Sequence, residues 1–392
     1  MPMKKLYLFN PDSDLALANG NTNYMPPASA RQMASDLAVL PVWYAEPGSV
    51  VLAPSACHRS FLKEMQQRIP LPATLLTEPE VAAETALSPM PWGWNPAVRK
   101  RFLRMGIAEE VLPSASQMAA FRRLSHRQRA VELLPRLQLS DSFCGESFYL
   151  TDAVQWEQFV EAHETCLLKA PLSGSGKGLN WCRGEFTSFV SGWCGRVSAM
   201  QGGVVGEPVY EKAADFAMEF QSDAGGRVVF AGYSLFATGA SGAYEGNLLL
   251  SDAEIESRLS AFVPLSALRL LRQRLTEELS ALLGADYAGY LGVDMMICRV
   301  DDSYKIHPCV EINLRMSMGM VARLLFDRYL HPGAQGVFRV SYASSAAGAT
   351  AEEERLSAEF PLQLSGGSIL SGYLPLVPVT GRSQYRAWVQ VL

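Results

Sequence analysis

The chain has 392 residues, of which 48% are hydrophobic and 19% charged, a composition typical of a globular protein and too apolar for a disordered one. Lys and Arg number 34 against 39 Asp and Glu, and the resulting net charge of −5 argues against a general nucleic-acid-binding protein, which needs a basic excess. A chain of this length predicts two or three domains.

Membrane and secretory segments are not expected. The first apolar run, residues 6–9, is far shorter than the roughly 7 to 15 residues of a signal-peptide core or the roughly 20 of a membrane helix. The seven cysteines are scattered and form no CxxC pair, as is typical of reduced thiols, and the five histidines form no metal-binding pair. The sequence therefore predicts a cytoplasmic protein that acts on neither membranes nor nucleic acid, with its histidines on the surface or lining the core.

The first predicted unit, residues 1–112, alternates strands and helices. Residues 5–10 and 49–53 have the composition of short buried strands, and helices are expected over 28–36 and 97–105. The loop 10–27 places Asp12, Ser13 and Asp14 directly after the first strand, where open α/β sheets bind ligands. A capped turn explains these residues equally well.

Residues 113–206 form a second predicted unit, and residues 207–392 a third. In the second, helical periodicity covers 116–134 with an interruption at 125–126, Asp152 can cap a helix that runs to 163, and 166–169 is a short strand. In the third, strand-like alternation at 215–221 and 227–236 precedes a helix over 265–283. The small, polar segment 343–351 is expected to be mobile, and the last forty residues to be strands and turns.

Two apolar runs joined by Asp-Asp-Ser predict a β-hairpin over residues 292–313. A turn centred between residues 302 and 303 places Asp294 opposite Glu311, at about 4.5 to 5.5 Å between Cβ atoms, with Asn313 on the same face. Facing carboxylates repel unless they share a cation or a proton, and carboxylates with an amide oxygen suit Mg²⁺. A solvent-facing polar side of an ordinary hairpin is an equal alternative, because Pro308 and a register slip of one residue would each disturb the pair.

The segment 173–178 is rich in glycine and could cradle a phosphate, because backbone N–H groups and Lys177 can surround an anion. It is not a Walker A loop, since Pro171 stands where the first glycine would fall and Gly178 where Ser or Thr should follow the lysine. Alone it is better interpreted as a flexible surface loop. Lys169 ends the preceding strand, however, so two lysines and three glycines converge within ten residues.

Together these pieces resemble the ATP-grasp superfamily over about residues 113–325. The resemblance implies an α/β protein: an ATP-grasp fold, with a small lid subdomain at 113–206 and a large core subdomain at 207–392, preceded by an N-terminal α/β (pre-ATP-grasp) domain. It further implies that Lys169 contacts the nucleotide phosphates and that the loop with Gly174, Gly176 and Lys177 closes over them.

The resemblance also assigns roles further along the chain. Glu207, Val209 and Tyr210 are similar to the hinge that binds adenine, and Asp215 lies where a carboxylate binds ribose. The segment from Glu311 to Ser317 is similar to the family's E-x-N-x-R-x-S run, so the resemblance makes Asp294, Glu311 and Asn313 the metal ligands, and Arg315 catalytic together with Lys177. The lysine that the family commonly has at the start of the lid is missing, and Arg127, ahead of His126, is the candidate to replace it.

The implied function is an ATP- and Mg²⁺-dependent ligase that joins a small-molecule carboxylate to an amine through an acylphosphate. A small-molecule kinase with the same nucleotide site and a non-catalytic ATP-binding module are the alternatives. Neither substrate is predicted, and a homo-oligomer is left open.

Overall fold

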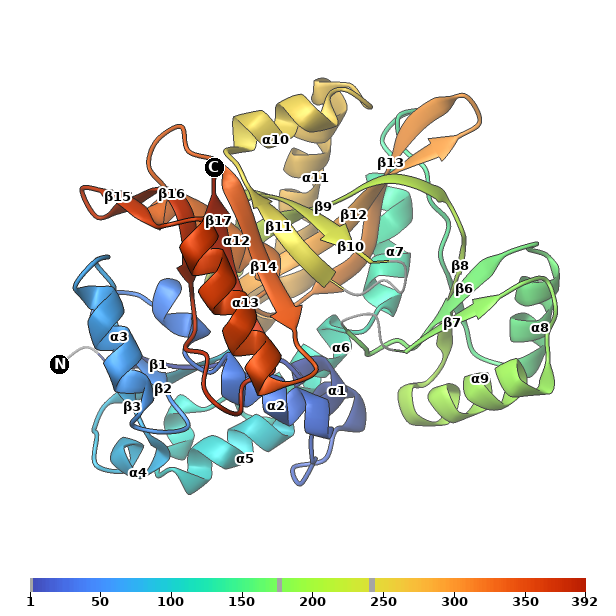
Figure 1. The fold of residues 1–392 in the computed structure, drawn as a ribbon. Helices are drawn as coiled ribbons and strands as arrows, with labels where there is room; N and C mark the ends of the chain where they lie inside the picture. The colour runs from blue at the N-terminus through green and yellow to red at the C-terminus, as the bar shows by residue number, and fades with distance from the viewer. Residues whose placement is uncertain (1–2, 175–177, 240–243) are drawn as a thin grey trace.

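The computed structural model describes residues 3–174, 178–239 and 244–392, and its strands form three sheets with helices packed against them (Figure 1). Predicted site residues Gly176 and Lys177 lie outside the described residues.

The N-terminal sheet is parallel, with the order β3-β2-β1-β4. Its strands are β1 (Lys4–Leu8), β2 (Val50–Leu52), β3 (Thr74–Leu76) and β4 (Leu87–Pro91), and the helices of this unit are α1 (Ser13–Asn19), α2 (Ala28–Asp36), α3 (His58–Gln66), α4 (Glu78–Val81) and α5 (Pro96–Arg104). Of the two central strands, β2 is buried throughout and β1 over its last three residues, as expected for a parallel sheet covered on two faces. The two strands and two helices predicted here are confirmed.

A small antiparallel sheet, in the order β5-β8-β6-β7, stands at the right of Figure 1 with α8 and α9 beside it. Its elements are β5 (Phe148–Leu150), α8 (Ala153–Glu161), β6 (Cys166–Lys169), β7 (Leu179–Cys182), α9 (Ser188–Gln201) and β8 (Val204–Pro208). Asp152 caps α8 as predicted, because its side chain accepts a hydrogen bond from the Gln155 backbone N–H at 3.0 Å.

The central sheet has nine strands in the order β13-β12-β9-β10-β11-β14-β17-β16-β15, and its pairings are antiparallel. The strands are β9 (Glu211–Ser222), β10 (Val228–Thr238), β11 (Tyr244–Leu249), β12 (Gly289–Val300), β13 (Ser303–Asn313), β14 (Gly336–Tyr342), β15 (Gln363–Ser365), β16 (Ser368–Pro375) and β17 (Tyr385–Val391). The helices around it are α6 (Ala115–Leu124), α7 (Gln128–Leu137), α10 (Asp252–Leu259), α11 (Leu265–Leu283), α12 (Met318–Tyr329) and α13 (Ala346–Glu359).

Two apolar clusters join the N-terminal unit and helices α6 and α7 to the central sheet, whereas the small sheet has an apolar cluster of its own. Helices α6, α7 and α11 share a buried cluster with β9, β12 and β13, and the leucines of α11 that are fully buried there stand at helical spacing: Leu268, Leu271, Leu275 and Leu279. The second cluster joins the N-terminal unit to α12 and the C-terminal strands, and Trp43 donates its indole N–H to the Leu376 carbonyl at 2.6 Å. The N-terminal unit is thereby held against the central sheet, which brings its loops to the site.

Two expectations are wrong because of α13, which runs from Ala346 to Glu359 and so also covers the start of the last forty residues, expected to be strands and turns. Residues 343–351 are not a loose segment, since α13 begins at Ala346, where Ser345 caps it by accepting from the Gly348 N–H and alanines favour helix. The division at 112 and 206 stays a prediction, with β8 continuous through residue 206 and α6 and α7 packed into the core of the central sheet. Among the described residues, no helix is both long enough and apolar enough to span a bilayer.

Candidate functional site

The predicted carboxylate pair lies in the hairpin β12–β13. Asp294 is the direct partner of Glu311, and the Asn313 side-chain N–H₂ donates to Asp294 Oδ2 at 2.9 Å. Burial and the facing charge of Glu311 raise the pKa of Asp294 to about 7. The hairpin therefore holds two carboxylates and an amide within one cluster, as the sequence predicted.

The turn from which this pair is predicted is displaced by one residue in the structure. Val300 pairs with Ser303, so Asp301 and Asp302 form the turn, and Asp301 has the positive φ of 54° that a tight hairpin requires. That turn alone would set Asp294 opposite Cys309. A bulge over 308–310 adds two residues to β13 and restores the predicted pair, at the place where Pro308 has no N–H for the ladder.

Arg315 follows β13 directly and connects the hairpin to the N-terminal unit. Its Nε lies 2.9 Å and its Nη2 2.8 Å from Asp14 Oδ2, and Nη2 also donates to Asn313 Oδ1 at 2.8 Å. Asp14 comes from α1, within the loop region that the sequence suggested for substrate. A Cβ added at Gly174 would collide with the Asp14 carboxylate, so a larger residue there would displace the Asp14 side chain.

Lys169 and Glu207, both predicted to contact nucleotide, bind each other on neighbouring strands of the small sheet. Lys169 Nζ lies 2.5 Å from Glu207 Oε2, and the two side chains are only 8% and 6% exposed. The Ser147 hydroxyl donates to the other Glu207 oxygen at 3.4 Å. The two residues form a buried ion pair, a mutual contact that no sequence pattern indicated.

Tyr210, one of the two remaining hinge residues, borders a histidine that sequence reasoning did not connect with the site. The Tyr210 ring lies 5.8 Å from the ring of His307, while Val209 is 41% exposed. His307 is fully buried, and neither ring nitrogen has a partner among the described residues. Burial lowers its pKa to about 4, so the ring is neutral at pH 7.

Arg127 is buried between β13 and the end of β6. Its guanidinium lies 2.7 Å from Glu311 Oε2 and donates to the Ala170 carbonyl at 2.6 Å and to the Ser173 hydroxyl at 2.5 Å. It thus connects the carboxylate pair to the glycine-rich segment. Arg127, the residue predicted to replace the lid lysine, is therefore a neighbour of both the predicted metal ligand Glu311 and the predicted phosphate loop.

Asp215, predicted to bind ribose, lies on β9. Its Oδ2 accepts from Lys212 at 2.5 Å and from Thr238 at 2.7 Å. Water reaches this pair more easily than the pair at Glu207, because Lys212 is 40% exposed.

A cavity of about 600 Å³ gathers part of the predicted set. The hairpin cluster, Arg315 and Gly174 lie on its wall, together with side chains from α1, α2, β10, β11, β14 and β17. The residues predicted at the hinge and for ribose do not line this cavity within the described chain. Arg127 connects the cavity to the strand that carries Lys169, because it contacts both Glu311 and the Ala170 carbonyl. The cavity therefore reaches from the carboxylate pair toward the N-terminal unit.

Glu219 lies on the same cavity wall and was not among the predicted residues. It is 1% exposed, and its Oε2 accepts from the Ser317 hydroxyl at 3.0 Å. Burial, with a smaller contribution from Asp294, raises its pKa to about 8. The signal available in the sequence was a charged residue between Met218 and Phe220, both buried on the opposite face of β9.

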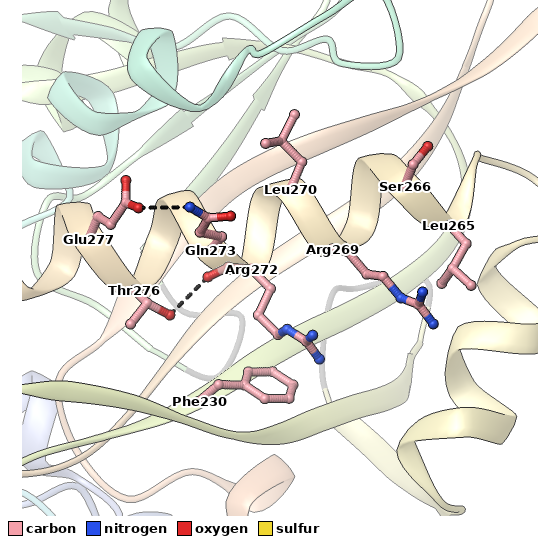
Figure 2. A pocket seen from close by; sticks show the side chains of 9 residues that line it. All are labelled: Phe230, Leu265, Ser266, Arg269, Leu270, Arg272, Gln273, Thr276 and Glu277. Atoms are coloured by element: carbon pink, nitrogen blue, oxygen red, sulfur yellow. Dashed lines mark hydrogen bonds between the residues drawn. The ribbon is translucent and has the colours of Figure 1, made fainter.

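A second hollow, of about 790 Å³, lies along the outer face of α11 (Figure 2). The Arg272 side chain extends over the Phe230 ring, 5.1 Å from its centroid, and Gln273 donates to Glu277 within the helix. Within the described chain none of the predicted site residues lines it, so the candidate site is the cavity at the hairpin.

The sequence matches no family model and no curated protein. The fold, in contrast, is similar to solved structures over the whole chain. They include the biotin carboxylase–βγ-ATP complex of Campylobacter jejuni (12% identity, TM-score 0.51, 100% of this chain and 87% of that one) and the N5-carboxyaminoimidazole ribonucleotide synthetase of Thermus thermophilus (12%, 0.50, 99% and 93%). The biotin carboxylase domain dimer of Hydrogenobacter thermophilus 2-oxoglutarate carboxylase, solved with MgADP, ADP and bicarbonate, is similar at 11% identity and TM-score 0.51, over 100% of this chain and 87% of that one. At these identities the likeness is one of architecture, and it confirms that this protein has an ATP-grasp fold with an N-terminal α/β unit.

Proposed function

We propose that this protein is an ATP- and Mg²⁺-dependent ligase that joins a carboxylate to an amine. The observation that carries the proposal is the cluster of Asp294, Glu311 and Asn313 beside Arg315 on the wall of one cavity. Two proteins of similar fold, the biotin carboxylase complexed with βγ-ATP and the domain dimer complexed with MgADP, bind nucleotides, which supports nucleotide binding here.

The donor set fits Mg²⁺ that arrives with a nucleotide. Two carboxylates and an amide are hard oxygen ligands, and in the described part of the chain no group of three or more His, Cys, Asp or Glu side chains could hold a metal by itself. Asp294, Glu311 and Asn313 would therefore share the ion with phosphate oxygens. The ion would offset charge on the transferring phosphoryl group.

On the nucleotide side, Glu207 and the backbone of Val209 and Tyr210 are the proposed adenine contacts, with Asp215 at the ribose. Lys169, Lys177 and the segment with Gly174 and Gly176 are proposed to contact the phosphates. Glu207 holds the Lys169 ammonium at the end of β6, so this positive charge is fixed before a nucleotide enters.

The proposed reaction has two steps. A substrate carboxylate oxygen attacks the γ-phosphorus, and ADP leaves to give an acylphosphate. The amine nitrogen then attacks the acyl carbon, the C–O bond to phosphate breaks, and the nitrogen loses a proton. Arg315 and Lys177 would stabilise the transferring charge, and no protein nucleophile is required.

The test is ADP release measured against panels of small carboxylates and amines, singly and in pairs. Release of free phosphate that needs both partners is the expected result, and Glu311→Gln should lower it at least about 100-fold because the phosphates lose a cation site. Glu211→Gln, at a glutamate that is 72% exposed, is the matched control. A Glu311→Gln protein that releases ADP at the normal rate would refute the site, a phosphorylated single acceptor would indicate a kinase, and Mg-ATP binding without ADP release would indicate a binding module.

A further inference from the structure

The described lining of the cavity at the hairpin has more acidic than basic side chains, although Arg127, which is outside the lining, pairs with Glu311. The described lining carries five carboxylates, with Arg315 as the single cationic side chain, and Arg315 is already paired with Asp14. Asp294 and Glu311 are the proposed Mg²⁺ ligands. Among the described residues, Glu219 has no cation within ion-pair distance.

The surroundings of Glu219 are shaped around its carboxylate. Gly292 lies on one side and Gly319 on the other, and a Cβ added at either glycine would collide with the Glu219 oxygens. Ser317 donates one hydrogen bond to Oε2, which does not replace the water that the carboxylate has lost. Without a ligand a proton neutralises such a buried group, and a cation that enters from the adjacent cavity could take the place of that proton.

The other walls of the cavity suit the body of an organic cation. Tyr342 and Tyr385 lie on its rim with ring centroids 5.1 Å apart, and Trp92 also lines it. Aromatic faces attract cations and pack against apolar carbon.

We propose that the amine acceptor is a primary amine that binds as a cation, with its ammonium group on Glu219 and an aromatic or apolar body against the tyrosines. The inference rests on the proposed ligase function and adds the charge class of the acceptor and the residue that selects it. Because Glu219 and Asp294 line the same cavity, an amine held there lies beside the place proposed for the acylphosphate, and its ammonium must lose one proton before the nitrogen can attack.

The experiment compares three probes of similar shape: 2-phenylethylamine, 2-phenylethanol and 3-phenylpropionate. Binding to the full-length protein is measured by calorimetry in the presence of Mg²⁺ and a non-hydrolysable ATP analogue. We expect the amine to bind at least about tenfold more tightly than the alcohol and the carboxylate. Glu219→Gln should weaken the amine at least about tenfold and leave the alcohol unchanged, since it removes the charge and keeps the shape.

The matched control is Glu245→Gln, the same change at an exposed glutamate on β11, which should bind all three probes normally. Equal or tighter binding of the alcohol or the carboxylate by the wild-type protein overturns the inference, and so does normal amine binding by Glu219→Gln. If that variant does not fold, the three probes on the wild-type protein decide. Absence of binding by every probe, while the nucleotide still binds, also overturns it. A wild-type protein that does not bind Mg-nucleotide refutes the proposed function itself, which separates the two failures.

Discussion

Glu207 and Glu219 are two glutamates of similar burial, 5% and 1% exposed, whose carboxyl groups have different partners. Glu207 has the Lys169 ammonium at 2.5 Å, whereas the partner of Glu219 within the described chain is the Ser317 hydroxyl. The contrast separates a carboxylate that is paired with a cation of the chain from a carboxyl group that, without a ligand, keeps a proton. Burial alone does not distinguish them, but the charges around each do.

The largest effect should follow from breaking the ion pair between Lys169 and Glu207. Lys169→Met leaves the Glu207 charge buried without a partner, so we expect the nucleotide-free protein to lose about 3 to 5 kcal/mol in its free energy of unfolding. Urea unfolding followed by circular dichroism measures the change.

The matched control for that experiment is the double variant Lys169→Met, Glu207→Leu. It should recover most of the loss, because replacing a whole buried pair with apolar groups is nearly neutral. A single variant that loses less than about 1 kcal/mol would show that Glu207 tolerates isolation, and the comparison with Glu219 would collapse.

The next effect concerns Glu219, where a substitution should stabilise the protein at high pH instead of destabilising it. Its pKa of about 8 in the folded protein exceeds the ordinary value of 4.5, so the folded protein retains a proton that the unfolded chain has released. Stability should therefore fall as the pH rises from about 4.5 to 8. Glu219→Gln cannot lose this stability, and we expect it to gain on the order of 3 kcal/mol over the wild-type protein between about pH 5 and pH 8.5.

Melting temperatures of both proteins across this pH range, without ligand, test the prediction. Glu245→Gln serves as control and should follow the wild-type curve, because its side chain is exposed. Parallel curves for Glu219→Gln and the wild-type protein would mean that the Glu219 carboxylate is not penalised by its burial.

The smallest effect is expected at an ion pair that water reaches. Lys212 and Asp215 lie 2.5 Å apart like Lys169 and Glu207, but Lys212 is 40% exposed and Thr238 also donates to Asp215. Lys212→Met should cost less than about 1 kcal/mol in the same urea experiment. A loss as large as that of Lys169→Met would show that distance, rather than burial, decides the energy of these pairs.

Local pattern was enough for the parts of the site that one hairpin determines. Asp294, Glu311 and Asn313 come from adjoining strands, so alternation and a turn signal brought them together. The predicted pairing of Asp294 with Glu311 is nevertheless correct only because two register shifts cancel. The turn is displaced by one residue, and the bulge at Pro308 adds two residues to β13.

Contacts between distant segments were not predictable in this way. Glu219 lies beside the hairpin because β9 pairs with β12, a strand far along the chain, and no local signal encodes that pairing. The same holds for Asp14, which reaches Arg315 only after the N-terminal unit packs on α12 and the C-terminal strands. The motifs of the family suggested the nucleotide contacts, but the partner of each charge required the fold.

The bulge in β13 separates the Asp294–Glu311 pair from the turn at Asp301 and Asp302. On its other edge β12 pairs with β9 both at Asp294 and near the tip at Arg299, so the position of the pair does not depend on the turn alone. The turn residues are exposed. Insertions at this tip should therefore leave the carboxylate pair in place, which makes residues 301–302 a suitable position for a fluorophore or an affinity peptide on an otherwise unaltered protein.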